Sequence, residues 1–195
     1  VRRDLLGSIQ EDARRLNQHI GALLDMARLE GGALKPSREL TDVREVASSA
    51  LRRLQPQLAG RTLRRDFARD LSLAPADPVL LEQVLLNLLA NAAAHTPPDA
   101  SIEVAAYEDP RSVLVSIEDD GAGVAPAELA RIFEKFHRAG PPEHGGGLGL
   151  GLSIARGFVE AMGGRLAAVS PIANGRGARF VVSLPKAAAM PRGLL

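Results

Sequence analysis

The sequence predicts an α+β fold in which helices pack against one face of a mixed, mostly antiparallel β-sheet. Residues 79–95 are apolar nearly all round, as expected of a buried central helix. Two segments that alternate apolar and polar residues, 102–106 and 113–117, predict a β-hairpin or meander. Two further strand-like segments, 165–170 and 178–184, follow the last predicted helix and extend the sheet.

Length and composition limit the classes of function. The 195 residues are 46% hydrophobic and carry a formal net charge of +1, which fits a globular domain with an appendage. This balance gives no concentrated basic face, so we expect no nucleic-acid partner. The chain has no cysteine, which excludes disulfides and thiolate zinc sites within it.

The start of the chain predicts a segment of a longer protein. The sequence begins at Val1 without a signal peptide, and no apolar run approaches the ~20 residues of a membrane span. We therefore expect no membrane contact by this segment, with any anchor of the parent protein lying elsewhere.

The first thirty residues predict an amphipathic helix that ends at Gly31-Gly32. Its apolar residues recur at steps of three and four, as a heptad seam does. The seam consists of Leu6, Ile9, Ala13, Leu16, Ile20, Leu23 and Ala27. Partner helices in a bundle or coiled coil would bury such a stripe, and so would the chain's own domain. The sequence leaves both arrangements open.

A linker or short edge strand is expected at 33–41. Asp42 with Glu45 forms a capping box, which predicts a helix through about Gln57. Two short strands are expected next, at 61–67 and 71–74.

Asp77-Pro78 predicts the start of the central helix, because it places an N-cap before a proline at the first helical position. Asn87 and Asn91 interrupt the apolar sequence and, four residues apart, lie on one face. Amides on a buried helix need hydrogen-bond partners. A core hydrogen-bond network and a pair of ligand-facing groups are both compatible with this pattern.

The hairpin runs into an acidic, glycine-rich turn that contains Asp119, Gly121 and Gly123. Glycines just past a strand let the backbone approach a planar ligand closely, and Asp119 is placed to accept a hydrogen bond from it. An acidic turn without a ligand is the alternative interpretation.

A glycine-rich run at 145–154 leads directly into a helix expected over 155–162. Uncovered N–H groups at a helix N-terminus form a cradle for phosphate oxygens, with the positive end of the helix dipole behind them. A flexible loop is the alternative. Residues 126–136 predict a short helix, the stretch 140–147 is expected to be mobile, and 187–195 are expected to form a flexible tail.

Four motifs now stand in a fixed order. They are Asn87-x-x-x-Asn91-Ala92, Asp119-x-Gly121-x-Gly123, Ile132-Phe133-Glu134-Lys135-Phe136 and Gly147-x-Gly149-x-Gly151-Leu152. This order resembles the N, G1, F and G2 boxes of the catalytic ATP-binding domain of sensor histidine kinases. The N-terminal helix, with Leu-Leu-Asp-Met-Ala-Arg-Leu-Glu at 23–30, resembles the second helix of that family's dimerisation and phosphotransfer hairpin, most like the KdpD type.

The resemblance implies a domain organisation and a fold. Residues 1–32 correspond to the hairpin helix, 33–186 to the catalytic ATP-binding domain and 187–195 to the tail. The implied fold is the two-layer α/β sandwich of the GHKL type, shared by gyrase B, Hsp90, histidine kinases and MutL. Other nucleotide signatures do not fit, because no lysine follows a glycine as in a Walker A loop and the glycine spacing is not G-x-G-x-x-G.

Carried onto this sequence, the resemblance implies a site for ATP and Mg²⁺. Asn91 is expected to hold Mg²⁺, a hard cation that prefers oxygen ligands, and Asn87 to face the same site. These two are the expected catalytic residues. Asp119 is expected to accept a hydrogen bond from the adenine amino group, with Gly121 and Gly123 allowing the base to lie against the backbone.

The resemblance also implies contacts to the phosphates. The glycine-rich run is expected to hold them through N–H groups, and a lid over about 125–147 to close over the nucleotide. Lys135 or Arg138 on this lid is expected to reach the γ-phosphate. The further nucleotide-binding residues that the resemblance implies are His95, Lys135, Arg138, Gly147, Leu148, Gly149, Leu150, Gly151 and Leu152.

Three departures from the family pattern accompany the resemblance. Ala94 stands where family members often carry a lysine that contacts phosphate. Leu148 stands where threonine or serine is usual. None of the four histidines lies in a phosphoacceptor motif, so the acceptor histidine is expected outside this sequence.

The expected function is transfer of the ATP γ-phosphoryl group to that histidine, for relay to an aspartate on the receiver domain of a response regulator. The parent is expected to be a homodimer anchored in the bacterial inner membrane, with this portion in the cytoplasm. A GHKL-type ATPase is one alternative, but those enzymes carry a water-activating glutamate where Asn87 stands, and an amide cannot take that proton. A nucleotide-binding or dimerisation module without turnover is the other.

Overall fold

A computed structural model describes residues 2–138, 148–173 and 175–187, with side chains described at only some of the first fifteen positions. Five strands form the main sheet in the order β2-β4-β5-β7-β6. The pair β2–β4 is parallel and the other three pairs are antiparallel, which confirms the predicted mixed sheet.

In chain order the elements are α1 (Arg2–Glu30), β1 (Glu39–Thr41), α2 (Val43–Arg53), β2 (Thr62–Phe67), β3 (Ala74–Ala76), α3 (Pro78–His95), β4 (Ser101–Glu108), β5 (Ser112–Asp119), α4 (Pro126–Leu129), α5 (Gly151–Ala161), β6 (Arg165–Val169) and β7 (Ala178–Pro185).

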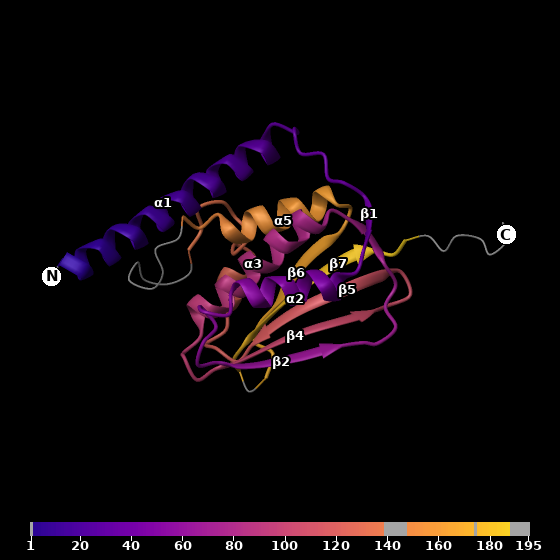
Figure 1. Cartoon of the computed structure of the whole chain (residues 1–195). Helices are drawn as coiled ribbons and strands as arrows, with labels where there is room; N and C mark the ends of the chain where they lie inside the picture. The colour runs from indigo at the N-terminus through magenta and orange to yellow at the C-terminus, as the bar shows by residue number, and fades with distance from the viewer. Residues whose placement is uncertain (1, 139–147, 174, 188–195) are drawn as a thin grey trace.

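Helices α2, α3 and α5 cover one face of this sheet, as Figure 1 shows. Side chains along β4 and β5 alternate between buried and more exposed positions, so the sheet turns one apolar face toward the helices. Large, fully buried side chains fill the core between the helix layer and the sheet, among them Leu88 on α3, Phe158 on α5 and Phe180 on β7. This arrangement confirms the α+β two-layer fold predicted from the sequence.

The predicted helix starts agree with the structure, but one helix end differs. Asp77 accepts hydrogen bonds from Val79 N and Leu80 N at 3.0 and 3.1 Å, and so caps α3 as predicted. Asp42 caps α2 by accepting from Arg44 N at 2.9 Å. This helix ends at Arg53 rather than near residue 57. Proline at position 56 lacks an N–H group and disfavours helical backbone in the residue before it, so the chain leaves the helix there.

Three other boundaries differ from the sequence-based expectations. Strand β3 lies at Ala74–Ala76 rather than at 71–74, because its position is set by pairing with β1, where Leu40 faces Pro75. The helix expected over 126–136 is helical only at Pro126–Leu129 and then continues as turns. Helix α5 begins at Gly151, four residues before the expected start, so the last glycine of the run belongs to its first turn.

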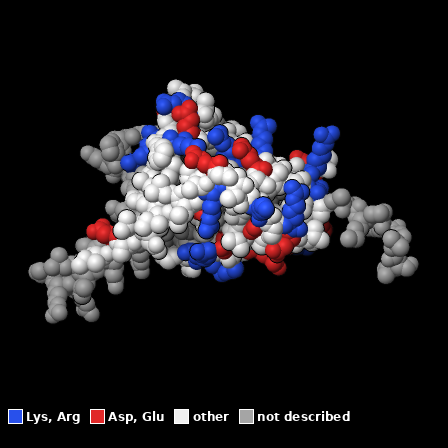
Figure 2. All heavy atoms as spheres, turned by 90° about the horizontal axis from the view of Figure 1, so that it is seen from above, with Lys and Arg blue, Asp and Glu red and all other residues white. Residues whose placement is uncertain are grey.

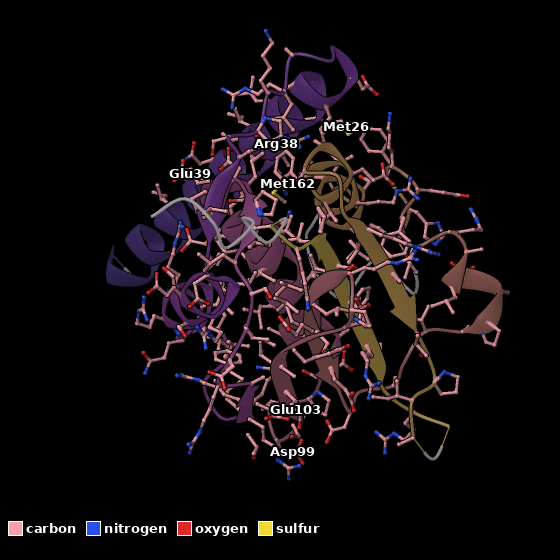
Figure 3. The ribbon with its side chains drawn as sticks, turned by 90° about the vertical axis from the view of Figure 1, so that its right-hand side faces the viewer. Met26, Arg38, Glu39, Asp99, Glu103 and Met162 are labelled. Carbon is pink, nitrogen blue, oxygen red and sulfur yellow. The ribbon has the colours of Figure 1, made fainter. Side chains whose placement is uncertain are left out.

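The C-terminal part of α1 packs against the main body of the molecule. Ala22, Met26 and Leu29 lie against the core, and Met26 is labelled in Figure 3. A Cβ atom on Gly157 of α5 would lie 2.8 Å from Leu29 Cδ1, so the two helices are in close contact. One of the two arrangements open from the sequence, burial by the chain's own domain, therefore applies to this end of α1.

The N-terminal part of α1 projects away from the helix layer (Figure 1). Of the seam residues whose side chains are described there, Ile9, Leu16 and Ile20 are 63%, 60% and 47% exposed. Seen from above, charged side chains of both signs cover the body of the molecule, while the described atoms of the projecting part are mostly uncharged (Figure 2). Within the described residues, no helix is long and apolar enough to span a membrane.

Candidate functional site

The two asparagines of α3 face the start of α5. Asn87 Nδ2 donates a hydrogen bond to the carbonyl oxygen of Gly151 at 3.3 Å. Asn91 lies one turn further along and is half-buried, and among the described residues none is hydrogen-bonded to its side chain. The pair is therefore no closed core network, because one amide is bonded to the glycine-rich run and the other remains available to a ligand.

Within the part of the chain that the structure describes, no side chain caps the first-turn N–H groups of α5. The N-cap residue is Leu150, which makes no capping hydrogen bond, in contrast to the aspartates that cap α2 and α3. Leu150 is only 1% exposed, and Leu148 and Leu152 pack against the core. The leucines thus anchor the run while its backbone amides are left for an anion. Gly147, expected to bind phosphate, lies outside the described residues.

Asp119 ends β5 and is buried, with 6% of its surface exposed. One carboxylate oxygen accepts a hydrogen bond from Gly121 N at 3.0 Å. Burial raises the pKa of the Asp119 carboxyl, and the neighbouring charges of Asp120 and Glu118 raise it further, against the N–H groups of Gly121 and Ala178. A buried acceptor with a raised pKa is the kind of group that binding sites contain.

The loop after Asp119 is braced by residues that the sequence analysis missed. Ser170 Oγ accepts from Val124 N at 2.7 Å and donates to the carbonyl of Gly177 at 2.8 Å. Gly177 N donates in turn to the carbonyl of Gly121 at 2.9 Å. Gly177 has φ +80° and would place a Cβ atom 2.5 Å from Asp119 O, so only glycine fits there. The one signal in the sequence was the pair of glycines in the turn before β7.

Residues 132–138 pack against α5 and the glycine-rich run. The Arg156 guanidinium of α5 lies 5.6 Å from the centroid of the Phe133 ring. His137 Nε2 lies 2.6 Å from Glu128 Oε2, which ties the segment to α4. A Cβ atom on Gly149 would lie 2.6 Å from His137 O. The motifs that resemble the F and G2 boxes are therefore in direct contact.

Lys135, which the sequence analysis expects at the γ-phosphate, is paired with a carboxylate in this structure. Lys135 Nζ forms an ion pair of 2.5 Å with Glu30 at the end of α1. His95 lies exposed at the end of α3, and Arg138 is the last residue described before 148. Their assigned contacts to nucleotide stay predictions. The segment expected to be mobile lies, for residues 139–147, outside the described residues.

The candidate site does not coincide with the surface pocket on the other side of the sheet. A hollow of about 320 Å³ lies on the outer face of the sheet, where Glu103, Ser116 and Arg179 are among its lining residues. It contains none of the residues that the sequence places at the nucleotide.

Comparisons with known proteins agree with this geometry. The model of the "Histidine kinase-, DNA gyrase B-, and HSP90-like ATPase" family matches residues 76–188. The Sensor protein KdpD of Clostridium acetobutylicum is 33% identical over 187 residues, which are 95% of this chain and 21% of KdpD. The Sensor histidine kinase CusS of Escherichia coli O157:H7 is 31% identical over 185 residues, which are 94% of this chain and 38% of CusS. The chain thus spans between a fifth and two fifths of these relatives.

Solved structures show the same relationship. Full-length ShkA, determined in complex with AMPPNP, superimposes with a TM-score of 0.82 at 28% identity, over 97% of this chain and 40% of ShkA. The mycobacterial sensor histidine kinase MprB gives a TM-score of 0.67 at 29% identity, over 75% of this chain and 97% of that structure. The chain therefore belongs to the histidine kinase-, DNA gyrase B- and HSP90-like ATPase family, within which it is a catalytic ATPase domain of the sensor histidine kinase type.

Proposed function

We propose that this domain binds Mg·ATP between α3, the loop after β5 and the start of α5, and transfers the γ-phosphoryl group to a histidine outside this sequence. The observation that carries the proposal is the hydrogen bond from Asn87 to Gly151, which sets the asparagine face of α3 against a helix N-terminus free of side-chain caps. A triphosphate at this place would find N–H donors for its oxygens on one side, and its Mg²⁺ would find an amide oxygen on the other.

The residues present fit a magnesium ion that is bound together with the nucleotide. Among the described residues, no group of three or more His, Cys, Asp or Glu side chains could hold a metal by itself. Mg²⁺ commonly keeps several waters and takes few protein ligands beside substrate phosphates. Asn91 would supply one amide oxygen. When bound, the ion would neutralise charge on the phosphate oxygens.

The protein's part in the reaction is positioning. Asp119 would accept from the adenine amino group and the amides at the start of α5 would hold the phosphates, which fixes the γ-phosphorus for attack by the imidazole nitrogen of the acceptor histidine. The bond from the γ-phosphorus to the bridging oxygen then breaks as the N–P bond forms, and ADP carries away the bridging oxygen. Lys135 and Arg138 would be the cations that reach the γ-phosphate, and Lys135 would first have to leave Glu30.

An ATPase that hydrolyses its substrate is disfavoured by Asn87. Its amide nitrogen donates to Gly151, and an amide is no base that could activate water. A module that binds nucleotide without turnover would share the whole site, and phosphotransfer distinguishes it from the kinase.

We further propose that the exposed seam of α1 is buried in the full-length protein by partner helices of a homodimer. Each large side chain buried there would contribute roughly 1.5–3 kcal/mol. The phosphorylated histidine would then pass its phosphoryl group to a receiver-domain aspartate. On this proposal the present domain is the cytoplasmic portion of a membrane-anchored kinase.

The test is incubation with γ-labelled ATP, with and without a separate protein that supplies the missing helix and its histidine. We expect acid-labile label on the added protein only, and loss of that label in an Asn91→Ala variant. Acid-labile label on this chain alone would contradict the proposal. Binding of ATP without label on either protein would favour the module without turnover.

A further inference from the structure

One arginine holds the C-terminal end of α3. Arg61, at the entrance to β2, donates from Nε to Thr96 Oγ1 at 2.9 Å and from Nη2 to the Thr96 carbonyl at 2.8 Å. The same Nη2 donates to the carbonyl of Ala93. Nη1 donates to the carbonyl of Gln57 at 3.1 Å, in the turns that follow α2. One side chain thus joins the ends of two helices.

The chemistry of this contact suits an arginine. The last carbonyl groups of a helix have no partner within it, and a positive charge at this end is favoured by the helix dipole. The planar guanidinium offers five donors in a fixed fork, so it satisfies several carbonyls at once and holds them in one geometry. Thr96, which is 7% exposed, also donates from Oγ1 to Ala92 O at 2.7 Å.

Thr96, which Arg61 holds in this way, packs against Gly121 in the loop proposed to bind adenine. A Cβ atom on Gly121 would lie 2.9 Å from Thr96 Cγ2, 3.0 Å from His95 O and 2.8 Å from the Asp119 carboxylate. Gly121 therefore fits between the end of α3 and Asp119 without room for a side chain. The turn from α3 to β4, where Asp99 is labelled in Figure 3, leads into Ser101, whose N–H group donates to Asp120 Oδ1 at 2.9 Å.

We infer that Arg61 is a positioning residue for adenine recognition: by fixing Thr96 it sets where Gly121 lies, and so where the Asp119 carboxylate points. The inference rests on the proposed role of Asp119. Arg61 has no described contact with the start of α5, so the phosphate-binding amides do not depend on it directly. Loss of Arg61 should therefore weaken selectivity for adenine more than affinity for the triphosphate.

The matched control is Arg44, whose guanidinium also bonds backbone carbonyls, those of Ala68 and Arg69, and the carboxylate of Asp42. None of these acceptors belongs to the candidate site. Arg61→Ala and Arg44→Ala each remove a multiply bonded arginine, so both should lower the melting temperature. Only the first should alter the choice between nucleotides.

The experiment measures Kd for Mg·ATP and Mg·GTP by calorimetry, at a temperature where each variant is fully folded by its own melting curve. We expect Arg61→Ala to reduce the preference for ATP over GTP by about tenfold, the effect of about 1.4 kcal/mol, and Arg44→Ala to leave it unchanged. Arg61→Lys should restore part of the preference, because an ammonium keeps the charge and reaches fewer acceptors.

Thr96→Val provides a second test, because it keeps the β-branched shape and removes the hydroxyl that Arg61 and Ala92 share. It should reduce the ATP preference in the same direction, and it replaces Arg61→Ala as the test where that variant does not fold. An unchanged preference in Arg61→Ala, or in Thr96→Val, would assign Arg61 to helix capping alone. A wild-type domain that binds ATP and GTP equally would instead overturn the adenine role of Asp119, and that failure would appear before any variant is made.

Discussion

Asn87 and Gly151, 64 residues apart in the sequence, are joined by a hydrogen bond from the amide Nδ2 to the carbonyl oxygen at 3.3 Å. This bond fixes the distance between the central helix and the first turn of α5. Asn91, on the same face of α3, has no such bond among the described residues. We therefore expect two asparagines four residues apart to have different roles, one in holding the fold and one in binding the ligand.

Replacing each asparagine by alanine should separate these roles. Asn87→Ala removes a hydrogen bond between two elements, so it should lower the free energy of unfolding by about 1 kcal/mol. Asn91→Ala should change stability by less than about 0.5 kcal/mol and should weaken Mg·ATP while leaving metal-free ATP binding unchanged. Urea unfolding and calorimetry with Mg²⁺ or EDTA make the measurement. Equal stability losses in the two variants would contradict the assignment.

Asp119→Asn should weaken ATP binding by about 1–3 kcal/mol, because a charged acceptor is replaced by a neutral one. The folded-state pKa of Asp119 is raised above its usual value of 3.8, so the folded protein binds more protons than the unfolded chain between 3.8 and that raised value. The contribution of Asp119 to stability is thus fully present below pH 3.8, where the group is protonated, and is lost as its ionisation sets in with pH rising through the raised pKa.

The asparagine variant removes this cost while keeping an oxygen that accepts from Gly121. We therefore expect its unfolding free energy at pH 7 to equal or exceed that of the wild type, with a flatter pH dependence just above pH 3.8. Loss of both stability and ATP affinity at neutral pH would show that Asp119 is needed for folding. Calorimetric scans between pH 3.5 and 7 measure the unfolding free energy of both proteins, and the slopes of that free energy against pH are then compared.

Gly149→Ala should damage the phosphate site, and Gly163→Ala is its control. Both glycines have positive φ, +71° and +78°, so each substitution carries a backbone cost of about 1–2 kcal/mol. A Cβ atom at 163 meets nothing within 4 Å, whereas one at 149 lies 2.6 Å from His137 O. Gly149→Ala should therefore cost about 1–3 kcal/mol more and weaken ATP. Similar melting temperatures and ATP affinities for the two variants would refute a close contact between Gly149 and the segment at 132–138.

The contact between α1 and α5 should depend on packing more than on charge. Leu29→Ala removes a half-buried side chain that touches Gly157, so amide exchange in the last two turns of α1 should accelerate. Leu24→Ala, at a position that is 55% exposed, is the matched control and should leave exchange unchanged. Lys135→Glu breaks an exposed ion pair and should change stability by less than about 1 kcal/mol. A larger effect from Lys135→Glu than from Leu29→Ala would contradict this ranking.

The sequence predicted those parts of the fold that depend on neighbours in the chain. Asp77 caps α3 as predicted, because the cap and its acceptors lie within three residues. Strand β3 was placed too early, since its position depends on pairing with β1 some 35 residues away. The end of α2 was predicted too late because the effect of a single proline outweighed the apolar pattern.

The residues of the candidate site were predicted from the motifs, but the residues that hold them in place were not. Arg61 bonds to a residue 35 positions away and Ser170 to one 46 positions away, and no periodicity or local spacing signals such contacts. The ion pair of Lys135 with Glu30 was not predicted either, because it depends on where α1 docks, and the contact of Lys135 with the phosphates stays a prediction. The predicted domain boundaries at 32 and 186 stay predictions.

Helix α1 has 29 residues, and those of its described side chains that pack against the core lie near its C-terminal end, which gives it the properties of a lever. At 1.5 Å per residue, about 30 Å of rigid helix extends beyond the docked turns. A tilt of about 10° at the docked end therefore sweeps the free end through about 5 Å, and a push of that size at the free end becomes a shift of only about 1–2 Å at Leu29 and Glu30. Such a tilt would therefore convert large, weak displacements of the free end into small, forceful ones beside α5 and Lys135.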